Sequence, residues 1–243
     1  MVHGAFCGGW AYDGFRKPFE AAGHRVLCPD LRGHDPKTGS PAGVSMSAYA
    51  RDIADLCKGL DVPPILIGHS MGGLVAQMAA RLVPTKAVVL LAPSPPWGVS
   101  GSSFEEAVTA FGVQMAGAFW GQGVSADPTL MRTYSLDRMP RAERDATIKR
   151  LVPESGRALT ETLNWWIDPF MTTGVGSGGL GSPTLVMVGQ KDMVHPPATA
   201  HLIAERLGAS FIEMPGMSHW LLGEEGWEDV ADRAMGWMSD LQT

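Results

Sequence analysis

Residues 68–72 read Gly-His-Ser-Met-Gly and directly follow the apolar run Pro-Ile-Leu-Ile at residues 64–67. A helix-forming segment rich in Leu, Ala, Met and Gln comes next. A serine on such a strand-to-helix turn is held in strained backbone geometry, with its hydroxyl exposed above the edge of a sheet. The glycines at positions 68 and 72 lack Cβ atoms, so the chain can turn tightly here without clashes. The first N–H groups of the helix point to where an oxyanion would form, which makes Ser70 a candidate nucleophile.

Length and composition describe an ordinary globular protein. The chain has 243 residues, of which 45% are hydrophobic and 18% are charged, enough for one α/β domain with an elaboration. A net charge of −6 and the lack of a basic stripe argue against nucleic-acid binding. No apolar run approaches the roughly 20 residues that span a bilayer, so we expect no membrane insertion. The cysteines Cys7, Cys28 and Cys57 are scattered without metal-type pairing. This usage is typical of reduced thiols in a cytoplasmic protein.

Short apolar segments alternate with helical patterns along most of the chain. Several of these segments are continuous Val/Ile/Leu runs, as in parallel strands that are covered on both faces. The sequence therefore predicts a doubly wound, mostly parallel sheet of an α/β protein. The predicted strands cover residues 25–29, 65–68, 87–91, 184–188 and 210–214, and the predicted helices cover residues 47–60, 72–82, 198–207 and 227–241.

The alternation stops between residues 94 and 182, where only helical patterns occur. Apolar residues between positions 104 and 119 recur at helical spacing, and Asp127-Pro128 is a typical helix start. We expect Pro140 and Pro153 to open two further helices. The glycine-rich stretch 174–182 predicts a flexible connector. The expected organisation is an α/β core of residues 1–93 and 183–243, with an all-helical cap and connector at 94–182.

Two loops can complete a catalytic constellation with Ser70. Asp192 follows the predicted strand 184–188, and His219 follows the predicted strand 210–214. Because parallel strands end at the same edge of a sheet, the three side chains can meet, His219 as the base and Asp192 as the group that orients it. The loop after the predicted strand 87–91 offers only Ala, Pro and Ser at positions 92–94, which favours Asp192 as the acid.

The order Ser70, Asp192, His219 and four further motifs resemble the α/β-hydrolase superfamily, in its capped esterase-like branch. These motifs are His-Gly-Ala at 3–5 followed by Gly-Gly-Trp at 8–10, Pro-Asp-Leu-Arg-Gly-His at 29–34, Gly-Gln-Lys-Asp at 189–192 and Gly-Met-Ser-His at 216–219. They extend over nearly the whole chain. The resemblance implies an α/β-hydrolase fold in which the N–H groups of Ala5 and Met71 form the oxyanion hole.

The chain departs from that family pattern at its start. Two strands and most of a third normally precede the His-Gly loop, but only Met1 and Val2 do so here. We therefore expect these N-terminal strands to be missing and the native start to lie upstream.

Aromatic and histidine side chains near the triad divide into candidates for binding and for structure. Phe6, Trp97 and Trp220 are the candidate substrate-binding residues. His195 is close to Asp192 in sequence, so it is either structural or in contact with the site. Three of the remaining histidines are expected to be structural. His3 would support the oxyanion loop, which is the loop that carries Ala5, His69 would pack beside the turn that carries Ser70, and His34 would fix its own turn. His24 and His201 are expected to lie on the surface.

These residues predict a serine hydrolase that cleaves carboxylic esters of small-to-medium hydrophobic substrates through an acyl-enzyme. Such chemistry requires neither a metal nor an organic cofactor. The same triad also suits a carbon–carbon bond hydrolase, a lactonase, a cyanohydrin lyase or a perhydrolase, since fold does not determine reaction. A ligand receptor with slow or no turnover is the alternative outside enzymes.

Overall fold

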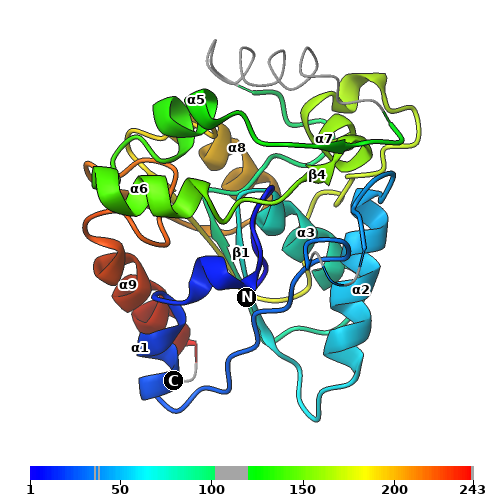
Figure 1. Cartoon of the computed structure of the whole chain (residues 1–243). Coiled ribbons are helices and arrows are strands. Elements are labelled where there is room, and N and C mark those ends of the chain that lie inside the picture. Colours follow the sequence, from blue (N-terminus) through cyan, green and yellow to red (C-terminus); the bar gives the residue numbers. More distant parts are fainter. Residues whose placement is uncertain (36, 38, 102–119, 242–243) are drawn as a thin grey trace.

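The computed structural model describes residues 1–35, 37, 39–101 and 120–241 of the chain. Its centre is a four-stranded parallel sheet with the order β1-β2-β5-β6. Helices surround this sheet (Figure 1). The strands are Ile65–His69, Ala87–Leu91, Thr184–Gly189 and Ser210–Met214. The helices around the sheet are α1 (Arg16–Ala21), α2 (Met46–Lys58), α3 (Met71–Ala80), α8 (Pro197–Leu207) and α9 (Trp227–Asp240), with a 3-10 turn η1 (Gly9–Tyr12). The predicted doubly wound, mostly parallel sheet is confirmed.

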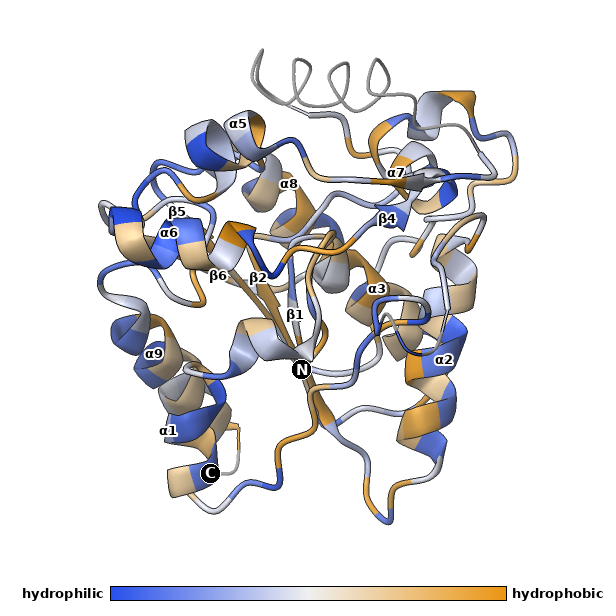
Figure 2. Ribbon diagram, in the orientation of Figure 1, coloured by the Kyte–Doolittle hydropathy of each residue, from blue (hydrophilic) through white to orange (hydrophobic). Residues whose placement is uncertain are grey.

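Alternate residues of each strand point to opposite layers of the protein. In β2, Val88 and Leu90 join the core cluster that packs under α2, α3 and α8. Val89 and Leu91 join the cluster on the other face, together with residues of α1 and α9. Figure 2 shows the strands as mainly hydrophobic and the outer helices as two-sided. Burial on both faces explains why these strands appear in the sequence as continuous apolar runs.

Four of the five predicted strands are confirmed, but residues 25–29 do not form a strand. In that stretch, Leu27 accepts a hydrogen bond from the N-terminal amine of Met1 at 2.6 Å. None of the described strands pairs with residues 25–29 to form a ladder. Apolar character alone therefore did not make this stretch a strand. Val2 forms an isolated parallel bridge with Gly68 and thereby occupies the free edge of β1.

The segment between β2 and β5 forms the cap above the carboxyl edge of the sheet (Figure 1). Its described elements are β3 (Gly123–Val124), α5 (Pro128–Leu130), the π-helical turn η2 (Met131–Ser135), α6 (Arg141–Ile148), β4 (Glu154–Ser155), α7 (Gly156–Leu163) and η3 (Trp165–Ile167). The prediction of an all-helical insertion is corrected, because β3 and β4 pair as an antiparallel ribbon. The predicted helical pattern at 104–119 lies outside the described residues.

Two of the three prolines expected to mark helix starts in the cap do so. Asp127 caps α5 by accepting from the N–H groups of Thr129 and Leu130, as expected. Pro140 immediately precedes α6, also as expected. Pro153 does not open a helix: it lies just before β4, and Ser155 provides the cap of α7 by accepting from Ala158 N.

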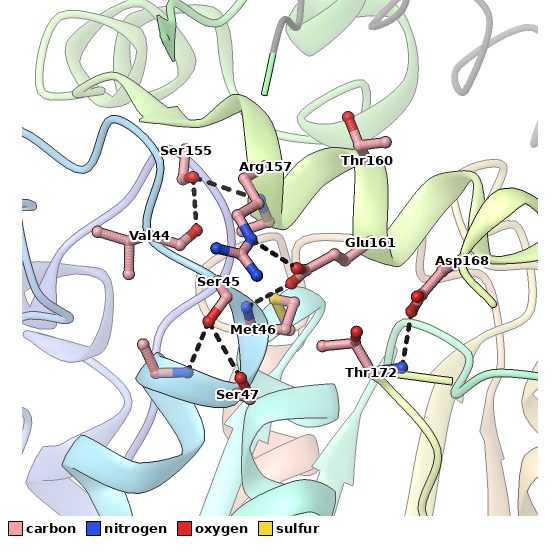
Figure 3. A network of polar contacts seen from close by, with 12 residues as sticks. Val44, Ser45, Met46, Ser47, Ser155, Arg157, Thr160, Glu161, Asp168 and Thr172 are labelled. Atoms are coloured by element: carbon pink, nitrogen blue, oxygen red, sulfur yellow. Dashed lines mark hydrogen bonds and ion pairs between the residues drawn. The ribbon is translucent and has the colours of Figure 1, made fainter. Parts of the chain in front are cut away.

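Two buried polar groups attach the cap to the start of α2 (Figure 3). The Glu161 carboxylate accepts from Met46 N at 2.7 Å and from Arg157 Nε at 2.8 Å. Ser155 Oγ donates to Val44 O at 2.6 Å. A carboxylate is favoured at this place because the N-terminus of a helix carries partial positive charge.

The glycine-rich stretch 174–182 is packed against the core along part of its length. Val175 and Leu180 are buried in the core cluster, and Arg206 Nε donates to Gly176 O at 3.0 Å. These contacts correct the expectation of a freely flexible connector.

Candidate active site

The turn between β1 and α3 places Ser70 at the edge of the sheet. Its backbone has φ 52° and ψ −125°, a strained conformation for a residue with a side chain. The main chain is anchored by Ser70 N donating to Leu91 O at 3.0 Å and Gly73 N donating to Ser70 O at 2.8 Å. A Cβ on Gly68 would lie 2.4 Å from Gly72 O, so only glycine permits this turn.

The structure brings the three predicted triad residues into one hydrogen-bonded chain. His219 Nε2 lies 3.1 Å from Ser70 Oγ, and His219 Nδ1 lies 2.9 Å from Asp192 Oδ2. The loops that carry Asp192 and His219 are joined by Lys191 N donating to Met217 O at 2.8 Å. Sequence order and sheet order thus bring the predicted nucleophile, base and acid to the distances that serine catalysis requires.

The second oxygen of Asp192 is held by the backbone. Oδ1 accepts from Val194 N at 2.8 Å and from His195 N at 2.9 Å, while Oδ2 faces His219. Burial alone would raise the pKa of this carboxyl, but the His219 ring and these donors outweigh burial and hold the pKa below its usual range. Asp192 is therefore ionised at neutral pH and favours a proton on His219 Nδ1, which leaves Nε2 free to accept the Ser70 proton.

The predicted oxyanion donors lie beside the nucleophile. Ala5 and Met71 both line the cavity that contains Ser70. Met71 is the first residue of α3, so its N–H has no acceptor inside the helix. Gly4 approaches the nucleophile so closely that a Cβ there would be 3.1 Å from Ser70 Cβ.

His3 supports this oxyanion loop, as expected. Its Nδ1 donates to Gly4 O at 2.9 Å, and its Nε2 accepts from Leu31 N at 2.9 Å. This pattern requires the neutral ring. Burial lowers the pKa of His3 to about 3, in agreement with that assignment.

A cavity opens above Ser70 between the sheet edge and the cap. Of the predicted substrate-binding residues, Phe6 and Trp220 line it. Trp97 does not, and this prediction is corrected: its indole N–H donates to Asp168 O at 3.1 Å, and its ring packs on Trp165. Its side chain is used to join the cap to the loop after β2. Apolar residues from several elements complete the wall: Cys7, Met71, Val124, Leu130, Met131, Leu159, Leu163 and Val194.

Residues 1–233 match the family described as the alpha/beta hydrolase family. The chain belongs to this family. In the described residues, its fold has a parallel four-stranded sheet, fewer strands than the family usually shows. No described helix is long and apolar enough to cross a membrane.

This alpha/beta hydrolase is related to esterases and methylesterases. It is 38% identical over 92 residues to a pyrethroid hydrolase of Sphingobium wenxiniae, a match covering 37% of this chain and 33% of the relative. The chain thus matches about a third of that relative's length.

Two solved structures resemble this alpha/beta hydrolase along nearly its whole length. A methylesterase from Arabidopsis has a TM-score of 0.75 at 19% identity, over 98% of this chain and 97% of that one. A thermophilic esterase from Thermogutta terrifontis has a TM-score of 0.73 at 25% identity, over 100% of this chain and 89% of the other. The similarity to the methylesterase concerns the fold alone.

His69 does more than pack beside the turn that carries Ser70. It also holds the base loop of this alpha/beta hydrolase, which is the loop that carries His219. Its Nε2 donates to His219 O at 2.9 Å, and the two rings lie 5.0 Å apart. Burial, with a smaller effect of His219, lowers the pKa of His69 to about 3, so the ring is neutral.

A buried ion pair at the base of the cap was not predicted from the sequence. His34 was expected to support its own turn, and its Nδ1 does lie 3.2 Å from Leu31 O. However, its Nε2 also lies 2.8 Å from Glu154 Oε2. Both partners are acceptors, so both nitrogens must donate and the ring must be the cation. Burial opposes this charge, but the Glu154 carboxylate outweighs it and raises the pKa of His34. Tyr49 Oη and Ser155 N also donate to Glu154, at 2.8 and 2.7 Å.

A second unpredicted carboxyl supports the base loop. Glu224 is buried and accepts from Ser218 N at 2.8 Å, next to His219. Burial raises the pKa of Glu224 to about 7. Glu154 pairs with His34 across 120 positions, and Glu224 reaches back six positions along its own loop to Ser218, so neither contact follows a standard local spacing.

Proposed function

We propose that this chain is a carboxylic-ester hydrolase that works through an acyl-enzyme. The observation that carries the proposal is the hydrogen-bonded chain from Ser70 Oγ through His219 to Asp192, which opens into an apolar cavity. The relatives named as esterases and hydrolases support the same class.

In the proposed mechanism each of these side chains has one step. His219 Nε2 takes the Ser70 proton as Oγ attacks the acyl carbon, and the N–H groups of Ala5 and Met71 stabilise the oxyanion. His219 then returns the proton to the leaving alcohol. Water repeats the sequence, giving the acid and regenerating Ser70. The apolar wall, with Phe6 and Trp220, favours small-to-medium hydrophobic esters.

A chain-length series of p-nitrophenyl acyl esters tests the proposal. Wild-type protein should hydrolyse them, and Ser70→Ala should lower kcat by about 10⁴- to 10⁶-fold. Ser239→Ala is the matched control, because this serine is exposed in α9. Retained ester hydrolysis by Ser70→Ala would contradict the mechanism. Absence of turnover in both proteins would redirect the assay to cyanohydrin, lactone and carbon–carbon bond substrates.

A further inference from the structure

Three buried polar side chains line the cavity without belonging to the triad or its immediate support. They are Ser94, Thr162 and His195, which are 3%, 4% and 4% exposed. Other polar lining residues, such as Ser125 and Asp127, are exposed and lie at the rim. The mechanism above uses none of the three buried groups.

Ser94 and His195 form a pair beside the nucleophile. Ser94 Oγ lies 2.9 Å from His195 Nε2. The backbone brings Ser94 to Ser70, because Ser94 N donates to Ser70 O at 3.0 Å. The His195 ring centroid is 5.4 Å from that of His219.

Sheet order determines on which side of Ser70 this pair lies. β1 is bridged by Val2 on one edge and paired with β2 on the other. Ala5 follows Val2, whereas Ser94 follows β2, so the oxyanion donor and Ser94 flank the nucleophile on opposite sides. In a tetrahedral intermediate the oxyanion faces Ala5 and Met71, and the leaving oxygen faces His219. The remaining substituent of the intermediate is the acyl chain, and it therefore faces Ser94.

Thr162 adds an independent sign of a ligand from the cap side. Its Oγ1 is buried and has no hydrogen-bond partner among the described residues. Thr162 lies in α7, next to the apolar lining residue Leu163. A buried hydroxyl without a partner is destabilising, and rotation of the Thr162 side chain toward a substrate oxygen in the cavity would relieve that cost.

We propose that Ser94 and His195, with Thr162 on the cap side, form a polar subsite for a hydroxyl or keto oxygen on the acyl chain. The preferred substrates are then hydroxy- or oxo-carboxylic esters with this oxygen close to the scissile carbonyl. The proposal rests on the esterase function above. Because Ser94 and His195 satisfy each other in the free protein, a plain ester leaves neither of them unpaired. The preference is therefore modest, about 3- to 10-fold in kcat/KM.

The test compares p-nitrophenyl 3-hydroxybutyrate with p-nitrophenyl butyrate, each rate divided by that ester's alkaline hydrolysis rate. The wild type should favour the hydroxy ester by about 3- to 10-fold. Ser94→Ala and His195→Phe should each bring this ratio to about one, whereas the exposed-site control Ser239→Ala should keep the wild-type ratio. A wild-type ratio of one, or an unchanged ratio in both subsite variants, would overturn the subsite.

A binding experiment separates failure of the subsite from failure of the esterase function. Methyl 3-hydroxybutyrate and methyl butyrate are titrated into Ser70→Ala protein, with the melting temperature as readout. The hydroxy ester should raise the melting temperature more, and the double variant Ser70→Ala/Ser94→Ala should lose this difference. If the hydroxy ester binds selectively but the wild type turns over no ester, the subsite is supported and the esterase function is contradicted. Equal stabilisation by both esters would overturn the subsite.

Discussion

The triad edge of the sheet and the cap above it are held by different kinds of contact. At the triad edge, main-chain hydrogen bonds join the loops: Ser70 N donates to Leu91 O, Ser94 N to Ser70 O, and Lys191 N to Met217 O. In the cap, two buried carboxylates, those of Glu154 and Glu161, make many of the connections to the core. The loops of the predicted triad are therefore joined through the main chain at the sheet edge. The cap has main-chain contacts to the core as well, such as Val152 N donating to Phe6 O at 2.9 Å, but its buried carboxylate contacts are side chains that substitution can remove singly.

This difference suggests that chemistry and cap attachment can be disrupted separately. A substitution in the triad should reduce turnover while the protein keeps its stability. A substitution at the base of the cap should reduce stability while the remaining folded protein keeps the triad geometry. The largest effect is expected for the triad.

Asp192→Asn should lower kcat by about 10⁴-fold with little change in melting temperature. The new amide can keep its oxygen toward the N–H groups of Val194 and His195, where Oδ1 now accepts. Its NH2 group then faces His219 Nδ1 and forces the proton onto Nε2. In that tautomer His219 cannot accept the Ser70 proton. Ester kinetics measures kcat, and thermal unfolding followed by circular dichroism measures the melting temperature. Near-wild-type turnover would show that Asp192 does not orient the base.

Glu154→Leu should lower the free energy of unfolding by about 3–5 kcal/mol, because it removes the acceptor of His34, Tyr49 and the Ser155 amide. Urea unfolding measures this, and the exposed Glu228→Gln is the control. Glu154→Gln should cost less, since its oxygen can still accept from Tyr49 while its amide donates to a neutral His34. Equal stability of the Leu variant and wild type would show that the cap does not depend on this carboxylate.

The same pair predicts a pH window for stability. Interaction raises the pKa of His34 from 6.5, although burial opposes it, so this contribution is complete below 6.5 and is lost as pH rises through the raised pKa. Interaction lowers the pKa of Glu154 from 4.5, again against burial, so its contribution is complete above 4.5 and is lost as pH falls through the lowered pKa. The pair therefore stabilises most between 4.5 and 6.5. The difference between wild type and Glu154→Gln should be largest there; a difference independent of pH would contradict the ion pair.

The two regions also differ in how far the sequence predicted them. The triad could be located because each residue follows an apolar run at a strand end, and parallel strands bring those ends to one edge. The cap ribbon and the buried carboxylates could not, since Glu154 is 120 residues from His34 and the Pro-Asp-Leu-Arg-Gly-His motif at 29–34 does not indicate a partner in the cap. Trp97 shows the same limit: its position after a strand predicted the cavity, but a hydrogen bond to Asp168 turns it to the cap.

The smallest effect is expected at the junction of the two regions, where Glu224 supports the loop that carries His219. Burial raises the pKa of Glu224 from 4.5 to about 7, so the folded state disfavours its charged form. Stability from this group is therefore complete below 4.5 and is lost as pH rises through about 7.

Glu224→Gln keeps an acceptor for Ser218 N without the charge. It should be more stable than wild type by about 1–3 kcal/mol at pH 8, with no difference at pH 4. Urea unfolding at both pH values measures this, and the exposed neighbour Glu225→Gln should show no such pH-dependent gain. A Glu224→Gln protein that is less stable at pH 8 would mean that the charged carboxylate holds the base loop.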